Sequence, residues 1–219
     1  MTMNQQSTKE KAEALIGALE KYGQGDYIGE SISQLEHCLQ AAHQAHKAGM
    51  YRSTLISLTL TNFLLDARDE LVIAALLHDI GQIIPLESTK EARMNLRGSA
   101  ENVGRVGHEA IGASYLRSLG FSEVVCRLVN SHVAAKRYLT ATDQGYYESL
   151  SSASQKSLAF QGGPFRDANL KNFEEDPLRD EMVSLRLWDD AAKLEGIEAI
   201  TPRAGVYLDM IIAHLLRET

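Results

Sequence analysis

The sequence predicts an all-α fold, and three observations support this prediction. Residues 71–77 form an apolar run rich in Ala and Leu, which favours a buried helix over a strand. No stretch shows the alternation of apolar and polar residues that is typical of a half-buried strand. Apolar residues recur at helical spacing in several stretches, of which the first carries Ala12, Leu15, Ile16 and Leu19.

The expected helices follow one another along the chain and are separated by glycines, prolines and polar loops. Ser31 or Ser33 is placed to cap the second helix, and Gly81 stands where the core helix would have its C-cap. Residues 85–102 are expected to be a polar loop and residues 150–164 a mixed segment. The helices are residues 9–22, a second helix with Ile32, Leu35, Cys38, Leu39 and Ala42 on one face, and residues 68–80, 107–119, 122–139, 173–193 and 201–217.

The composition limits the class of protein. A chain of 219 residues with 44% hydrophobic and 23% charged residues is typical of one soluble domain, expected to span residues 1–219. A net charge of −7 argues against a nucleic-acid partner. Cys38 and Cys126 are too few for a disulfide framework, residues 1–11 lack the apolar core of a signal peptide, and residues 54–65 are too short to cross a bilayer. We expect a cytoplasmic protein with no membrane partner, and its oligomeric state stays open.

Histidines and carboxylates at the ends of apolar stretches predict a metal site. His78 and Asp79 end the core helix, where buried ionisable groups are costly unless they are paired or bound to a metal. A lone buried histidine is usually just a satisfied core residue, but the chain has three more with apolar neighbours. These are His37, His108 and His132. Imidazoles with a bridging carboxylate suit Fe, Mn, Zn or Ni, and Asp189 or Asp190 supplies a second carboxylate, between which spacing alone does not choose.

This pattern on an all-helical chain resembles the HD-domain superfamily in its dinuclear form. The chain is more similar to a branch of mixed-valent diiron oxygenases that cleave phosphonates than to the hydrolases of the superfamily. The resemblance implies two iron ions, Fe(II) and Fe(III), with O2 as co-substrate and Asp79 as the bridging ligand. The position of Lys193, one helical turn after Asp189, favours Asp189 over Asp190. The implied ligands are His37, His78, Asp79, His108, His132 and Asp189.

The segment Asp26-Tyr27-Ile28-Gly29-Glu30 matches the element that separates these oxygenases from the hydrolases. The resemblance implies that Tyr27 occupies an iron position until the substrate arrives. It also implies that Glu30 helps to displace the tyrosine and senses the amino end of the substrate. Lys136 and Arg186 would hold a phosphonate dianion, one as a point charge and the other through its fork. The implied substrate contacts are Gln82, Lys136, Ser154, Gln161, Arg186 and Lys193.

Two departures from the family pattern stand out. Gln82 takes the place of the histidine that usually closes the core motif, although an amide there still has hydrogen-bond donors for a phosphonate. Residues from about 50 to 65 form an insertion relative to the family, which is either a lid-like segment or a translated intron.

The implied reaction is oxidative cleavage of a C–P bond in a small-molecule phosphonate. The substrate would be a 1-hydroxy-2-(amino or trimethylamino)ethylphosphonate, and the products would be glycine or glycine betaine plus phosphate. The alternative is an HD-type phosphohydrolase that acts on nucleotides or phosphate monoesters with a metal-activated water. A regulatory HD module without catalysis is a third possibility, which the six filled ligand positions disfavour.

Overall fold

The computed structural model describes residues 3–27, 29–53, 61–85, 93–95 and 102–218. In this part of the chain the regular secondary structure is helical except for one short pair of strands and an isolated β-bridge between Asp26 and Ser33, which confirms the all-α prediction. The helices are α1 (Met3–Tyr22), α2 (Gln34–Ser53), α3 (Thr61–Leu77), α4 (Ile80–Ile83), α5 (His108–Leu119), α6 (Glu123–Thr142), α7 (Gln144–Ser149), α8 (Ser152–Phe160), α9 (Asp167–Glu174), α10 (Arg179–Ala191), the 3₁₀ helix η1 (Ala204–Tyr207) and α11 (Leu208–Arg217). The strands are β1 (Arg93–Asn95) and β2 (Asn102–Arg105).

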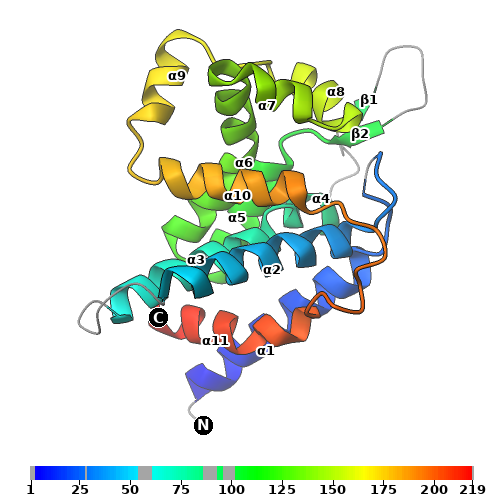
Figure 1. Cartoon of the computed structure of the whole chain (residues 1–219). Coiled ribbons are helices and arrows are strands. Elements are labelled where there is room, and N and C mark those ends of the chain that lie inside the picture. The colour runs from blue at the N-terminus through cyan, green and yellow to red at the C-terminus, as the bar shows by residue number, and fades with distance from the viewer. Residues whose placement is uncertain (1–2, 28, 54–60, 86–92, 96–101, 219) are drawn as a thin grey trace.

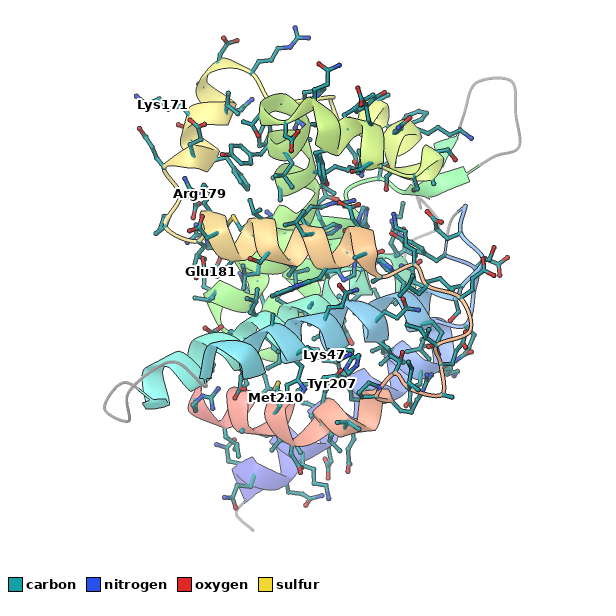
Figure 2. All side chains as sticks on the ribbon, viewed as in Figure 1. Lys47, Lys171, Arg179, Glu181, Tyr207 and Met210 are labelled. Atoms are coloured by element: carbon teal, nitrogen blue, oxygen red, sulfur yellow. The ribbon has the colours of Figure 1, made fainter. Side chains whose placement is uncertain are left out.

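Helix α3 is the centre of the bundle. It packs against α2, α6, α10 and α11, and residues Val72 to Leu77 are all at most 3% exposed. Figure 1 shows α10 and α2 as neighbouring layers, α1 and α11 paired below them, and α7, α8 and α9 above α10. Figure 2 shows Tyr207 and Met210 in the layer between α2 and α11. Tyr207 is 2% exposed. A helix buried on all sides needs apolar residues around its whole circumference, which explains the uninterrupted apolar run in the sequence.

Gly81 is not a C-cap, and that prediction was wrong. Helix α3 ends at Leu77, residues 78 and 79 form a turn, and Gly81 lies inside the short helix α4. A Cβ atom at Gly81 would lie 1.9 Å from the carbonyl oxygen of His108, so only glycine allows α4 to approach α5 this closely. The close approach brings the turn at His78 and Asp79 next to the first residue of α5.

Other differences from the sequence-based elements have local causes. The expected helix 173–193 is divided into α9 and α10, and Pro177 stands at the break, where it disfavours helical backbone at the preceding residue. The Asp176 carboxylate accepts a hydrogen bond from the Leu178 N–H (2.9 Å) and stabilises this turn. In the expected loop 85–102, β1 and β2 form an antiparallel pair that is too short to show an alternating pattern.

The predicted insertion at about residues 50–65 is described only in part. Helix α2 extends to Ser53 and α3 begins at Thr61, whereas residues 54–60 lie outside the described residues. Among the described helices, none is long and apolar enough to cross a membrane.

Candidate metal centre

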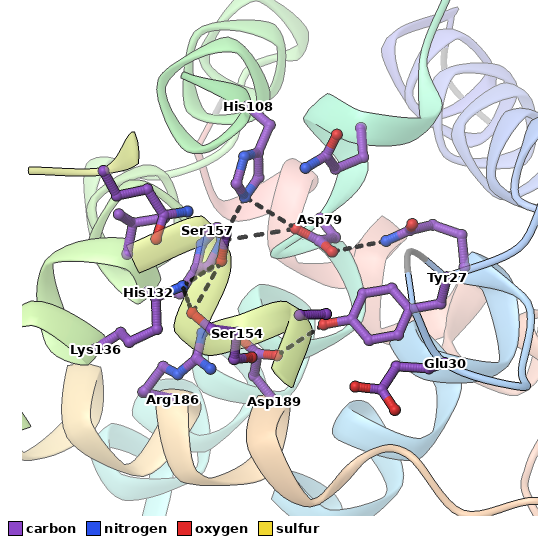
Figure 3. Close-up of a pocket in the computed structure, with 15 residues that line it drawn as sticks. Tyr27, Glu30, Asp79, His108, His132, Lys136, Ser154, Ser157, Arg186 and Asp189 are labelled. Carbon is purple, nitrogen blue, oxygen red and sulfur yellow. Dashed lines mark hydrogen bonds and ion pairs between the residues drawn. The ribbon is translucent and has the colours of Figure 1, made fainter. Parts of the chain in front are cut away.

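Six side chains from five places in the chain meet in the middle of the bundle. His37 comes from α2, His78 and Asp79 from the turn after α3, His108 from the start of α5, His132 from α6 and Asp189 from α10. Each of them is at most 5% exposed. The structure therefore brings together all six residues that the family resemblance implies as ligands, and Asp79 belongs to both clusters of possible ligands. Figure 3 shows Asp79 between His108 and Tyr27.

The backbone fixes the orientation of all four imidazoles. The Nδ1 atoms of His37, His78, His108 and His132 lie 2.8, 2.9, 3.1 and 2.8 Å from the carbonyl oxygens of Ala192, Ala75, Arg105 and Val129. A carbonyl oxygen only accepts hydrogen bonds, so each Nδ1 carries a proton, and in the neutral form of each ring Nε2 carries a lone pair. Metal-binding histidines commonly donate their second ring N–H in this way.

The four Nε2 lone pairs face one another in two pairs. The Nε2 atoms of His37 and His78 are 3.0 Å apart, and those of His108 and His132 are 2.9 Å apart. Two lone pairs cannot form a hydrogen bond with each other, so each pair requires a shared proton or a cation. The donor atoms therefore fit two metal ions, one for each pair of histidines.

Asp79 connects the two pairs of histidines. Its Oδ1 lies 3.3 Å from Nε2 of His108 and 3.6 Å from Nε2 of His132, and its Oδ2 lies 4.0 Å from Nε2 of both His37 and His78. One carboxylate thus supplies an oxygen to each set, which is the geometry of a bridging ligand.

The geometry favours Asp189 over Asp190 as the further carboxylate. Asp189 is 2% exposed, and its Oδ1 lies 3.3 Å from Nε2 of His37. Asp190 instead accepts a hydrogen bond from the Tyr146 hydroxyl (2.5 Å) and forms an ion pair with Arg186. Spacing along the chain did not choose between Asp189 and Asp190. In the structure Asp190 contacts Tyr146 on α7 and Arg186, whereas Asp189 lies beside His37.

The electrostatics keep the carboxylates ionised. Burial alone would raise the pKa of Asp79, but the charge of His78 and a hydrogen bond with His108 lower it below its usual range. Burial alone would also raise the pKa of Asp189, but the Arg186 guanidinium and His37 hold this pKa well below its usual range. Burial and the charge of His108 lower the pKa of His132 to about 3. Ionised carboxylates beside a neutral imidazole are the protonation states that metal ions bind.

A small cavity of about 60 Å³ opens above the centre. Tyr27 forms one wall, where its ring stacks on that of His37 with 3.8 Å between centroids and its hydroxyl lies 3.5 Å from Oδ1 of Asp189 (Figure 3). Burial and the charge of Asp189 raise the pKa of Tyr27, so the phenol is protonated in the metal-free protein. The lining residues are Tyr27, Glu30, Gln34, Asp79, Gln82, His108, His132, Val133, Lys136, Ala153, Ser154, Ser157, Gln161, Arg186 and Asp189.

Lys136 and Arg186 place two positive charges at the cavity wall. Lys136 is 3% exposed and donates to the Ser157 hydroxyl (2.9 Å). Burial and the nearby charge of Arg186 lower the pKa of Lys136 to about 7. Arg186 donates from Nη1 to Oδ2 of Asp189 (2.7 Å) and also pairs with Asp190, so two carboxylates already compensate its charge. Lys136 has no carboxylate partner within salt-bridge distance among the described residues.

The remaining expected substrate contacts differ in position. Gln82 and Gln161 line the cavity: Gln82 accepts a hydrogen bond from the Arg105 N–H (2.8 Å), whereas the side-chain oxygen of Gln161 has no partner among the described residues. Lys193 is not in the lining. Its ammonium lies 3.6 Å from Glu30 and 3.4 Å from the hydroxyls of Ser151 and Ser154, behind the wall.

Sequence reasoning missed several residues of the cavity. The side-chain amide of Gln34 donates to Oδ2 of Asp79 (2.6 Å). Its position one helical turn before His37 on α2 was an available signal, because residues three apart share a face. Ser157, one turn after Ser154 on α8, follows the same logic. The hydrogen bond that Nε of Arg186 donates to the Tyr146 hydroxyl (3.0 Å) carried no such signal, because it depends on where α7 packs.

Comparison with known proteins agrees with this geometry. Residues 35–159 match the family described as HD domain. The chain is 36% identical over 189 residues to a hydroxymethylphosphonate dioxygenase of Gimesia maris, covering 86% of this chain and 81% of the relative. It is 33% identical over 186 residues to a 1-hydroxy-2-(trimethylamino)ethylphosphonate dioxygenase (glycine-betaine-forming) of Leisingera caerulea, covering 85% and 82%. An uncharacterised protein of Acanthamoeba polyphaga mimivirus is 31% identical over 216 residues, covering 99% and 87%.

The match to the HD domain covers more than half of the chain, and the two named dioxygenases align with most of it. The chain therefore belongs to the HD-domain family, in a group of relatives that includes phosphonate dioxygenases.

Proposed function

We propose that the protein is an iron- and O2-dependent oxygenase that cleaves the C–P bond of a 1-hydroxyphosphonate. The observation that carries the proposal is the pair of donor sets that share Asp79, with the Tyr27 phenol beside one of them. The names of the two dioxygenase relatives support the reaction class. The proposed substrates are 1-hydroxy-2-(amino or trimethylamino)ethylphosphonates, which would give glycine or glycine betaine plus phosphate.

The proposed cofactor is a mixed-valent Fe(II)/Fe(III) pair. His37, His78, Asp79 and Asp189 would hold one ion, and Asp79, His108 and His132 the other. The pair would supply Lewis acidity toward the substrate oxygens and the electrons that activate O2. Tyr27 lies against the first donor set, so in the resting protein its ring and hydroxyl shield this set from water.

Lys136 is the proposed principal anchor of the phosphonate, because it lines the cavity and has no carboxylate partner of its own. Gln82 would donate from its amide nitrogen, since its oxygen already accepts from the Arg105 N–H. Ser154, Ser157 and the Arg186 fork would add neutral and charged donors around the same oxygens. Lys193 is proposed to act through Glu30 and Ser154 rather than by direct contact.

The group at C2 of the substrate is proposed to be a primary ammonium. Oε1 of Glu30 lies 3.6 Å from the Lys193 ammonium but accepts no hydrogen bond, and the side-chain oxygen of Gln161 is buried without a donor among the described residues, so both can accept from an N–H group. A quaternary ammonium would favour several aromatic faces. Tyr27 is the only phenyl-type ring in the described lining, and the cavity is small.

The decisive experiment is anaerobic electron paramagnetic resonance of iron-loaded, partly reduced protein titrated with 1-hydroxy-2-aminoethylphosphonate and its trimethyl analogue. The expected result is a coupled Fe(II)/Fe(III) signal that shifts with one compound, and then phosphate release when O2 is admitted. Iron without such a signal, unmoved by either compound, would contradict the proposal. Phosphate release from nucleotides or monoesters under argon would instead support the phosphohydrolase alternative.

We also propose that residues 1–219 form a single domain and that the protein is cytoplasmic. The support for a reducing compartment is that Cys38 and Cys126 are both buried and unpaired thiols.

A further inference from the structure

A second pocket adjoins the cavity of the metal centre on its histidine side. It has a volume of about 340 Å³, much larger than the cavity itself, and it lies between the start of α5, the middle of α6 and the end of α8. His108, Val133 and Gln161 line both spaces, so a wall one side chain thick separates them. We call it the side pocket. Its other lining residues are Val106, Gly107, Glu109, Asn130, Ala134, Arg137 and Phe160.

The chemistry of the side pocket does not suit a phosphonate. Glu109 places a carboxylate in its wall, 23% exposed and 3.5 Å from Nδ1 of His108. Arg137, the only cation among the described residues of its lining, donates to the carbonyl oxygens of Gly163 (2.7 Å) and Gly162 (3.2 Å) and stacks over the Phe165 ring. An anion would gain little here compared with the cavity, where Lys136 has no carboxylate partner.

The apolar part of the lining suits a small neutral molecule. Val106 and Phe160 are 51% and 46% exposed at the rim, and Val133 and Ala134 continue the apolar surface along α6 toward His132. Gln161 forms the rest of the separating wall. Its side-chain oxygen has no hydrogen-bond partner among the described residues, so no such bond holds that end of the amide in place.

We infer that the side pocket is the route by which dioxygen reaches the metal centre, an inference that rests on the proposed function. A cavity of about 60 Å³ is filled once a phosphonate occupies it, and Tyr27 and Glu30 cover its opposite side. A co-substrate that arrives after the phosphonate needs another way in. The side pocket ends at His108 of the second donor set, and His132, the other histidine of that set, lines the cavity on the far side of this wall.

The test replaces two alanines of α6 with phenylalanine, one inside the side pocket and one outside it. Ala134→Phe places a phenyl ring in the side pocket, whereas Ala141→Phe, seven residues later on the same helix, faces a separate groove between α6, α7 and α8. Val106→Trp, at the exposed rim, is a second block that does not alter the interior. For each variant, the KM for O2 is measured with iron-loaded enzyme, and the Kd for 1-hydroxy-2-aminoethylphosphonate is measured anaerobically by calorimetry.

We expect Ala134→Phe and Val106→Trp to raise the KM for O2 severalfold while the anaerobic Kd stays unchanged, and Ala141→Phe to change neither. Crystals of the metal-free protein under xenon pressure give a readout independent of turnover. Xenon should occupy the side pocket in the unmodified protein and in Ala141→Phe but not in Ala134→Phe. An unchanged KM for O2 in both blocked variants of an active enzyme, or no xenon in the side pocket, overturns the inference. If the unmodified enzyme converts no phosphonate, the proposed function has failed, and the xenon result alone decides whether the pocket admits apolar gas.

Discussion

At the scale of a single residue, the buried ammonium of Lys136 is proposed to bind the phosphonate, but its burial lowers the stability of the folded protein. Burial lowers its pKa from 10.5 to about 7, whereas in the unfolded chain the pKa returns to its usual value. Between pH 7 and 10.5 the unfolded state therefore binds more protons than the folded state, and the free energy of unfolding rises with pH across this window. Below pH 7 both states are protonated, and the folded state carries the full cost of a buried ammonium.

We expect Lys136→Met to stabilise the metal-free protein at pH 6 by roughly 2–4 kcal/mol, because one pKa unit corresponds to about 1.4 kcal/mol. The substitution should also abolish phosphonate binding and flatten the pH dependence between pH 7 and 10. Urea unfolding at several pH values checks this. Lys171→Met is the matched control, since Lys171 is exposed and pairs with Glu175 at the surface. Equal pH dependence in Lys136→Met and the unmodified protein would contradict the assignment.

Gln82 permits a second test at this scale, because its amide oxygen and nitrogen have different surroundings. Gln82→Glu keeps an oxygen for the Arg105 N–H and replaces the amide nitrogen with a second carboxylate oxygen. We expect phosphonate affinity to fall at least about tenfold, or about 1.4 kcal/mol, through charge repulsion. Anaerobic calorimetry measures the change. Gln82→Met, which removes the donor without adding charge, should lose less, and an unchanged affinity in Gln82→Met would argue against a donor role.

At the scale of helices, the sequence predicted elements well where one helix carries its own signals. Ser122 caps α6, accepting from the Val125 N–H, and Gly120 ends α5 in a left-handed conformation, so both boundaries were close to the prediction. Helix α7 and the β1–β2 hairpin carried no comparable signal. Gly81 was misread because its requirement for glycine comes from α5, a helix 27 residues further along, rather than from its own helix end.

The contact between α4 and α5 makes a prediction at this scale. We expect Gly81→Ala to cost about 1–3 kcal/mol or more of stability, because its Cβ overlaps the His108 carbonyl and forces the two helices apart. It should also weaken metal binding, since His108 begins α5. Urea unfolding and metal titration measure both effects. Gly17→Ala in α1 is the control: its Cβ meets nothing within 4 Å, so it should stabilise the protein by about 0.5–1 kcal/mol. Similar behaviour of the two variants would refute the packing argument.

At the scale of the whole molecule, the metal centre joins α2, α5, α6, α10 and the turn after α3. The ligand set was accessible from sequence only through the family resemblance, because spacing along the chain does not reveal which side chains converge. Tyr146 on α7 became apparent only once the helices were in place. Ions bound at this junction would link most of the bundle, so we expect metal binding and global stability to be coupled.

We expect the purified protein to bind two metal ions per chain and to melt at a lower temperature after treatment with a chelator. Asp79→Asn should reduce binding at both positions, because one carboxylate serves both donor sets, whereas His132→Ala should remove one ion and leave the other. Elemental analysis and thermal unfolding test this. Loss of only one ion in Asp79→Asn would show that Asp79 is not shared.

The imidazole anchors described above have a consequence for how such proteins diverge. His78 and His132 donate to the carbonyl oxygens of Ala75 and Val129, three residues earlier in the chain. Any amino acid at positions 75 and 129 provides the same carbonyl, so mutation there leaves the direction of the ligand intact. The orientation of these two histidine rings depends on the path of the main chain. Descendants of such a protein can exchange most neighbouring side chains, and with them the preferred substrate, before the metal centre loses its geometry.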